Sequence, residues 1–345
     1  MKFSLFVHME RVSPTDPEPR LYQEMLDLCH MADEGGMHAI WTGEHHGMSF
    51  TIAPNPLLNL VDIARRTKHV RLGTGTVIAP FWHPIRLAGE AAMADLIMDG
   101  RLELGIARGA YSFEYERLLP GLDAWNAGGR MRELIPAIKG LWAGDYALDG
   151  QYWQFPATTS APKPLQQPHP PIWVAARDPN SHEFAVAQGC NVQCTPLHNP
   201  HEEVVALMAR FNDACAKAPE QPRPRIMLLQ HGYVASDAAD ADLAARELNH
   251  FYNYFGAWFL NKRPIQNGLI QPLTEDEIAA HPFYSADVMR KNLLIGDKAE
   301  VIDKLHAIKA LGYDEFSLWI DSGQSFARKK AGLKRFIEDV MPAFA

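Results

Sequence analysis

The sequence has few cysteines and no long hydrophobic run. Its 345 residues contain four cysteines, Cys29, Cys190, Cys194 and Cys215. Cys190 and Cys194 lack the spacing and the second ligand pair of a zinc site, so we interpret all four as buried thiols and expect no metal. No window approaches the ~20 apolar residues of a membrane span, and the apolar stretch 3–7 is too short for the core of a signal peptide. We therefore expect a cytoplasmic protein with no membrane partner.

A block of positive charge is also missing. The chain has 33 Lys and Arg against 41 Asp and Glu, a net charge of −8, and these charges are spread along its length. Without a basic surface we expect no nucleic-acid partner, although one or two arginines can still bind a single phosphate. The content of 47% hydrophobic and 21% charged residues is typical of a globular enzyme with a large core.

What the chain does have is a regular alternation of short β-type runs and longer helix-type segments, such as 21–34 and 56–67. Eight such units favour a closed (β/α)₈ TIM barrel over an open sheet, because several strands end in polar or glycine-rich turns that can face one pocket. The length would also allow two ordinary domains; we expect one elaborated domain, residues 1–345. The predicted strands are 3–7, 39–43, 70–77, 102–107, 172–176, 190–195, 226–234 and 315–320.

Two stretches interrupt this alternation, one after the fourth predicted strand and one after the seventh. Residues 143–171 read as a hairpin followed by a proline-rich linker. Residues 236–297 form the larger insertion and contain a helix-like run, 244–260, rich in aromatic residues. These aromatics predict a cover over the barrel mouth, a subunit contact or simple packing. They are Phe251, Tyr252, Tyr254, Phe255, Trp258 and Phe259.

The most informative motif is the apolar run 39–43 followed at once by Glu44, His45 and His46. If the run is a buried parallel strand, its carboxyl end places these three side chains on the face where TIM barrels keep their active sites. We therefore take Glu44 and His45 as catalytic candidates.

The third and fourth predicted strands add two further signals. Gly73 and Gly75 remove side chains where a flat ring could approach the backbone, although glycines in a barrel strand can also simply relieve crowding. Arg108 follows the fourth strand, where a buried guanidinium needs an anion. That anion is either a ligand phosphate or the carboxylate of Glu44 or Glu103.

Taken in order and at their intervals, these motifs resemble the bacterial luciferase-like monooxygenases, flavin-dependent enzymes on a (β/α)₈ barrel. The similarity runs along the whole chain and is weakest at 236–297. The residues that carry it are Trp41-x-x-Glu44-His45-His46, Asn55-Pro56, Gly73-Thr74-Gly75, His83-Pro84 and Asp95-x-x-x-Asp99-Gly100-Arg101-Leu102-Glu103-Leu104-Gly105-Ile106-Ala107-Arg108-Gly109.

This resemblance implies FMN, bound as FMNH₂ and supplied by a separate flavin reductase. In this family the reduced flavin reacts with O₂ to give a C4a-peroxide that oxygenates an organic substrate. His45 aligns with the catalytic histidine beside the flavin ring, where an imidazole can exchange protons near neutral pH. Glu44 would then support the site, or else form a salt bridge inside the barrel. The family also implies a homodimer.

The same resemblance assigns the cofactor contacts. Thr74, Gly75 and Thr76 would lie beneath the flavin, with a non-prolyl cis peptide near Gly75-Thr76. Arg108 would lie at the flavin and its phosphate tail, and the turn after the fifth strand, with Ala176, Arg177 and Ser181, would bind the phosphate. The alternative for this turn is simple capping of a helix by Asp178 or Ser181. Ala107 replaces a cysteine that is reactive in luciferase, so details of light emission do not carry over.

On the substrate side, Trp82, Tyr111 and Phe113 predict an aromatic lining and hence a small hydrophobic organic substrate. Two other functions stay open. An F420-dependent oxidoreductase on the same barrel would transfer hydride without O₂, and a degenerate barrel could bind flavin without turnover. The presence of Glu44, His45 and Arg108 together speaks against the second.

Overall fold

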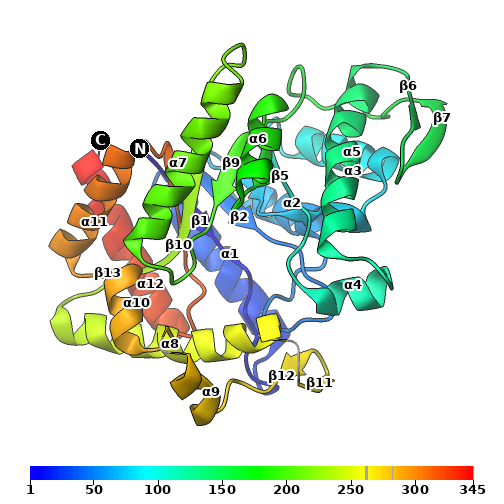
Figure 1. Cartoon of the computed structure of the whole chain (residues 1–345). Helices are drawn as coiled ribbons and strands as arrows, with labels where there is room; N and C mark the ends of the chain where they lie inside the picture. The colour runs from blue at the N-terminus through cyan, green and yellow to red at the C-terminus, as the bar shows by residue number, and fades with distance from the viewer. Residues whose placement is uncertain (261–262, 282, 345) are drawn as a thin grey trace.

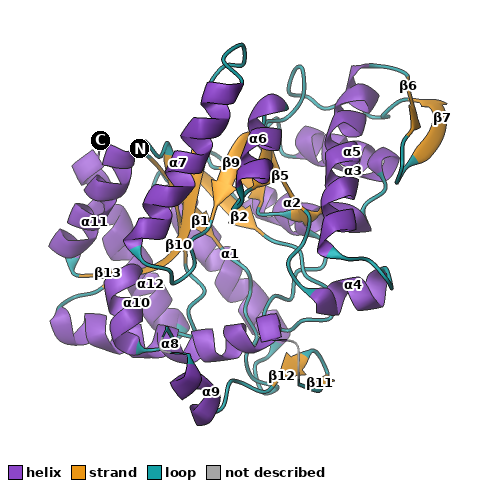
Figure 2. Ribbon diagram, in the orientation of Figure 1, coloured by secondary structure: helices purple, strands orange, loops and turns teal. Residues whose placement is uncertain are grey.

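A computed structural model describes residues 1–260, 263–281 and 283–344, and its centre is a closed ring of eight parallel strands (Figures 1 and 2). β1 pairs with β14 on one side and β2 on the other, and β10 pairs with both β9 and β14, which closes the ring. The predicted TIM barrel is confirmed. Its strands are β1 (Lys2–Phe6), β2 (Ala39–Thr42), β3 (Arg71–Thr74), β5 (Leu102–Ala107), β8 (Ile172–Ala175), β9 (Asn191–Cys194), β10 (Ile226–Val234) and β14 (Glu315–Trp319).

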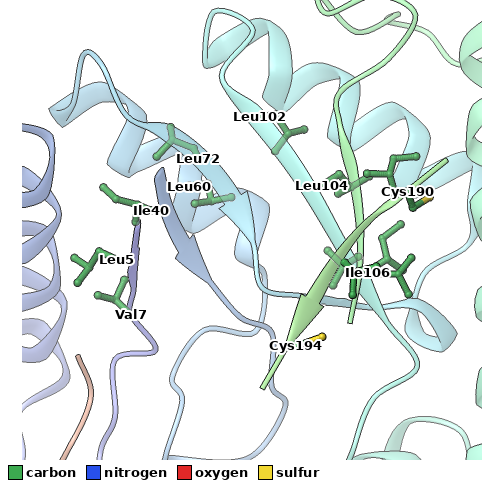
Figure 3. Packing of buried hydrophobic residues seen from close by; sticks show 14 of the residues in the cluster. Leu5, Val7, Ile40, Leu60, Leu72, Leu102, Leu104, Ile106, Cys190 and Cys194 are labelled. Atoms are coloured by element: carbon green, nitrogen blue, oxygen red, sulfur yellow. The ribbon is translucent and has the colours of Figure 1, made fainter. Parts of the chain in front are cut away.

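Alternate residues of each strand serve two separate cores. Leu5, Ile40 and Leu72 face outward and pack against the surrounding helices, for example against Leu60 of α2 (Figure 3). Their neighbours belong to a second cluster that fills the barrel, which includes Trp41. This alternation follows from the two-residue period of a strand. The interior of the barrel is therefore packed with side chains.

The helices that surround the barrel follow its strands in order. Two of these helices were predicted from their patterns. The segment 56–67 corresponds to α2, whose N-cap Asn55 accepts a hydrogen bond from the Leu58 N–H at 3.0 Å. The segment 21–34 corresponds to α1, which begins three residues before the expected Leu21. No helix in the described part of the chain is long and apolar enough to cross a bilayer. The helices are α1 (Glu18–Glu34), α2 (Pro56–Arg66), α3 (Pro84–Ile97), α5 (Ala124–Ala143), α6 (Pro179–Ala187), α7 (His201–Lys217), α11 (Lys298–Leu311) and α12 (Phe326–Arg335), with short turns η1 (Ala79–Phe81), η2 (Phe336–Val340) and η3 (Met341–Phe344).

The first insertion, between β5 and β8, contains the predicted hairpin. Its strands β6 (Tyr146–Asp149) and β7 (Gln154–Thr158) pair antiparallel. It also contains α4 (Ser112–Leu118), which comes directly after the end of β5.

The second insertion lies between β10 and β14 and contains the aromatic helix α8 (Ala238–Leu260). In Figure 1 this helix runs across the lower end of the molecule, where α4 and the β11–β12 hairpin also lie. Five of its six aromatic side chains are buried, and Phe259 is 47% exposed. The other elements of the insertion are β11 (Ile265–Gln266), β12 (Leu269–Ile270), α9 (Glu275–Ala280), α10 (Ala286–Asn292) and β13 (Leu294–Gly296), which pairs with β10.

Two details differ from the sequence prediction. The third strand was expected to span 70–77, but β3 ends at Thr74, and β4 (Val77–Ile78) pairs separately with β5. All four cysteines are free thiols, but Cys215 is only partly buried.

Candidate active site

Turns from four different strands meet at one cavity of about 430 Å³ at the carboxyl end of the barrel. Glu44, Thr76, Arg108 and Ser181 all line it, although they lie far apart in the sequence. The volume falls in the range of about 300–1,000 Å³ that is typical of cofactor and substrate sites. Nine of the twelve predicted site residues line this cavity: Glu44, His45, Gly75, Thr76, Arg108, Tyr111, Ala176, Arg177 and Ser181.

Three predicted residues do not line the cavity. Thr74 is fully buried, and its hydroxyl donates to the Gly105 carbonyl at 2.7 Å and accepts from the Gly105 N–H at 2.8 Å. Trp82 and Phe113 were expected in the substrate pocket, but both are buried in packing clusters. Their aromatic character reflects the core of the protein.

His45 is held by a carboxylate that the sequence analysis did not identify. Glu114, 1% exposed on α4, places Oε2 3.1 Å from Nδ1 of His45 and Oε1 2.7 Å from the backbone N of His46. An ionised Glu114 makes Nδ1 the protonated nitrogen, which leaves Nε2 of His45 as the atom that can exchange a proton.

His45 also lines a second, open groove of about 660 Å³. This groove lies between the start of α1, the loop 47–54 and the turn at Gly268. The imidazole can therefore exchange protons with solvent from outside the main cavity.

Glu44 supports the site through its neighbours. It accepts hydrogen bonds from the Ile78 N–H at 2.9 Å and the Trp82 indole at 2.8 Å, and Nε2 of His46 lies 2.6 Å from its other oxygen. Burial, the largest influence, lowers the pKa of His46, but the hydrogen bond and charge of Glu44 and the charge of Glu114 raise it above its ordinary value overall. Hydrogen bonds of Glu44 thus link the end of β2 to Ile78 of β4, to Trp82 and to His46.

The peptide bond between Gly75 and Thr76 is cis, as the sequence analysis predicts. The glycines here have different roles. A Cβ on Gly73 would lie 2.0 Å from the Trp41 ring, so the crowding explanation holds for Gly73, while Gly75 leaves room for Phe6 and also lines the cavity. Gln193 lines the same cavity with a buried Nε2 that has no hydrogen-bond partner. A flavin ring, with carbonyl and nitrogen acceptors on one edge, fits this unpaired donor.

The guanidinium of Arg108 was expected to be buried, but the structure shows this residue exposed, and among the described residues it makes no ion pair. The salt bridges considered for it do not form, because Glu44 is bound as above and Glu103 pairs with Arg71 and with Arg225 at 3.0 Å. The charge of Arg108 reaches Asp178 at the start of α6. A phosphate could bind at this unpaired cation.

The start of α6 shows the capping arrangement that was the alternative for this turn. Asp178 accepts hydrogen bonds from the Ser181 N–H at 3.0 Å and the Ser181 hydroxyl at 2.7 Å. Burial raises the pKa of Asp178, but the bonds from Ser181 and the charge of Arg108 lower it overall. Arg177 is exposed at this turn, so both Arg108 and Arg177 can offset the charge of Asp178 and of a bound phosphate.

Part of the remaining wall of the cavity is aromatic, and two of its residues, Phe50 and Trp319, come from parts of the chain that the sequence analysis did not assign to the site. Phe50 lies 4.9 Å from the His45 ring and 5.5 Å from Phe255 of α8, and Phe255 lies 5.9 Å from Trp319 (centroid distances). His8 follows β1 as Glu44 follows β2, and this position at a strand end is the signal that could have found it. Phe255 and Phe259 line the cavity, which agrees with the first of the three alternatives given for this segment, a cover over the barrel mouth.

Comparison with known proteins decides the family. The model of the luciferase-like monooxygenases matches residues 1–315. This chain belongs to that family. As a luciferase-like protein it is a flavin-dependent monooxygenase, which agrees with the function that the sequence motifs predict.

Two curated relatives show how the similarity is distributed. The chain is 68% identical, over 100% of its length and 96% of the relative, to the oxygenase component of flavin-dependent trigonelline monooxygenase from Acinetobacter baylyi. It is 26% identical to an alkanal monooxygenase alpha chain of Photorhabdus luminescens, over 75% of this chain and 69% of the relative.

Solved structures share the fold over the whole chain. The monooxygenase RslO1 from Streptomyces bottropensis has a TM-score of 0.84 at 29% identity, with 100% of both chains covered. The oxygenating constituent of 3,6-diketocamphane monooxygenase from Pseudomonas putida, solved with FMN, has a TM-score of 0.79 at 18% identity and covers 99% of this chain and 98% of its own.

Proposed function

We propose that this protein is the oxygenase component of a two-component system that takes reduced FMN from a separate flavin reductase and oxygenates trigonelline or a close pyridinium carboxylate with O₂. The observation that carries the cofactor part is the meeting of His45, the Gly75-Thr76 turn and the unpaired Arg108 at one cavity. The 68% identity along the full chain to a trigonelline monooxygenase component supports the substrate and the reductase.

In this proposal the flavin ring lies against Gly75 and Thr76, with the amide of Gln193 at its polar edge. Arg108 and Arg177, with Ala176 and Ser181 of the same turn, bind the phosphate. Bound reduced FMN supplies the activation of O₂, chemistry that no protein side chain provides. The protein supplies the orientation of the ring and, through α8, the exclusion of water.

His45 is the residue that holds and moves a proton. Glu114 fixes its Nδ1, so Nε2 is free to act on the substrate side of the cavity. The outer groove gives the imidazole a second route to solvent, separate from the main cavity.

The aromatic wall suits this substrate class. Trigonelline combines a permanently cationic pyridinium ring with a carboxylate, and cations bind favourably over the faces of Trp, Tyr and Phe. Phe50, Phe255 and Trp319 offer such faces around one part of the cavity. This proposal replaces the small hydrophobic substrate expected from the sequence by a flat aromatic molecule that carries charges.

Oxygen consumption tests the proposal. We expect trigonelline-dependent O₂ uptake when FMN is kept reduced, with one O₂ consumed per trigonelline lost. Turnover with reduced F420 in anaerobic buffer would instead identify a hydride-transfer enzyme, and binding of FMN with no turnover of either kind would identify a flavin-binding protein.

We also propose a homodimer that acts in the cytoplasm. α2 and α3 pack side by side and expose four large apolar side chains, Leu58, Met93, Leu96 and Ile97, each at least 41% exposed. Such a patch favours a contact with a second copy. Free thiols at all four cysteines fit a reducing compartment.

A further inference from the structure

His8 is a buried histidine of the cavity with no partner for its ring nitrogens. Its side chain lines the cavity, and the residue is 5% exposed. Nδ1 is enclosed and makes no hydrogen bond. Nε2 makes none with any described residue and is not among the enclosed atoms, so it is the nitrogen that a ligand in the cavity can reach.

Packing contacts and a main-chain hydrogen bond fix the position of the His8 ring. It packs edge-on against Phe6 at 4.5 Å and lies 5.3 Å from Trp319. A Cβ on Gly43 would lie 2.3 Å from Cε1 of His8, so a glycine is needed next to this ring. The His8 backbone N–H donates to Asp321, which anchors the main chain.

The surroundings of His8 favour its neutral form. Burial, followed by the charges of His45 and His231, lowers its pKa well below the ordinary 6.5. Asp321, which accepts the His8 backbone N–H, and Glu10 are paired with Lys329 at 3.7 and 2.7 Å, and Glu44 of the cavity is bound to Ile78, Trp82 and His46. A neutral, desolvated imidazole without a hydrogen-bond partner is unfavourable unless a ligand supplies that partner.

A substrate with a carboxylate would supply a hydrogen-bond partner for Nε2 of His8. Arg108 is not the counterpart for this carboxylate, because its charge acts at Asp178 and Tyr115, at the phosphate end of the cavity. His8 instead lies with Trp319 and His45, whose rings are 5.3 and 5.6 Å away, at the aromatic wall.

Resting on the proposed function, we propose that His8 is a substrate-binding residue whose Nε2 hydrogen-bonds the carboxylate of a pyridinium carboxylate, while Phe50, Phe255 and Trp319 hold the cationic ring. An anion beside a buried neutral imidazole favours the protonated form. Binding therefore draws a proton from solvent into the cavity.

Calorimetry on the FMN-loaded protein tests this proposal. Trigonelline and N-methylpyridinium, which lacks the carboxylate, are titrated near neutral pH in two buffers of different ionisation enthalpy. We expect proton uptake with trigonelline only. His8→Phe should raise the Kd for trigonelline at least about tenfold and abolish the uptake, with the Kd for N-methylpyridinium changed less than about twofold.

His8→Gln separates a binding role from a structural one. A Gln amide can donate a hydrogen bond but takes up no proton, so we expect part of the affinity back without proton uptake, and this variant also decides the matter if His8→Phe fails to fold. The control His30→Gln, on the exposed side of α1, should match the wild type.

Three results would overturn the proposal: an unchanged trigonelline Kd in both His8 variants, an equal loss for both probes, or no binding of trigonelline to the wild type. The proposed function is judged separately, by trigonelline-dependent O₂ uptake in the same preparations. Turnover without any His8 effect would remove only the role of His8.

Discussion

Oε2 of Glu114 lies 3.1 Å from Nδ1 of His45, and this contact joins the α4 insertion to the turn after β2. The same carboxylate accepts the His46 N–H, so one buried group fixes both the ring and the main chain of the histidine pair. Glu114 is thus a positioning residue for the proton-transfer group of the proposed mechanism.

Replacing Glu114 by Gln should lower kcat at least about tenfold, because the amide no longer fixes the tautomer of His45 or offsets a positive imidazole. FMN affinity should change less than about twofold. In a double-mutant cycle with His45→Ala, the second substitution should add little, because both act on one group. The exposed Glu116→Gln on the same helix is the matched control, and fully additive losses would show that Glu114 acts independently of His45.

The barrel and nine of the residues that line the cavity could be predicted from the sequence, because strand ends in a parallel barrel must converge. Glu44, Gly75 and Arg108 were found in this way. Glu114 was not, because α4 is an insertion whose path no local pattern determines. Trp82 was misplaced for a related reason: an aromatic residue beside a strand end can face the cavity or, as here, donate its indole N–H to Glu44 in the core.

The ion cluster at the other end of the barrel interior should be important for stability. Glu103, 1% exposed, pairs with Arg71 and Arg225 and accepts the Trp173 indole at 2.6 Å. Glu103→Ala removes the carboxylate that both guanidinium groups pair with and the acceptor of the indole, although Arg71 keeps the Gly100 and Leu102 carbonyls and Gln166, so the free energy of unfolding should fall by roughly 3 kcal/mol. Urea unfolding measures this loss. Glu183→Ala, which removes an exposed pair with Lys217, should lower the free energy of unfolding much less, and an equal effect of the two substitutions would contradict the assignment.

Acid should weaken the fold through His231. This side chain is fully buried, and burial, the largest influence, lowers its pKa well below 6.5. Below about pH 6.5 His231 is protonated in the unfolded chain but stays neutral in the folded chain. The contribution of neutral His231 to the free energy of unfolding is therefore complete above that pH and is lost as the pH falls. His231→Gln should make the decline shallower by up to ~1.4 kcal/mol per pH unit. Urea midpoints near neutral pH and near pH 5 measure how steeply stability falls with pH. If His231→Gln shows the same pH dependence as the control His30→Gln, this role of His231 is excluded.

The proposed dimer contact can be tested by one charge. Met93→Asp places a carboxylate in the apolar patch on α2 and α3 and should convert the dimer to monomers, because a buried unpaired charge is costly. Sedimentation equilibrium measures the mass. Leu243→Asp, at a 39% exposed leucine on α8, should leave the mass unchanged. A wild-type protein that sediments as a monomer at every concentration tested would contradict the proposed dimer.

The central claim is that the turns ending at Gly75, Thr76, Arg108 and Ser181 hold a reduced flavin, and a crystal structure of the protein grown anaerobically with FMNH₂ tests it most directly. The account predicts the ring against the Gly75-Thr76 peptide, within reach of Gln193 and His45, and the phosphate at Arg108 and Arg177. A flavin bound anywhere else, or a ring placed with its phosphate towards the aromatic wall of Phe50 and Trp319, would contradict it.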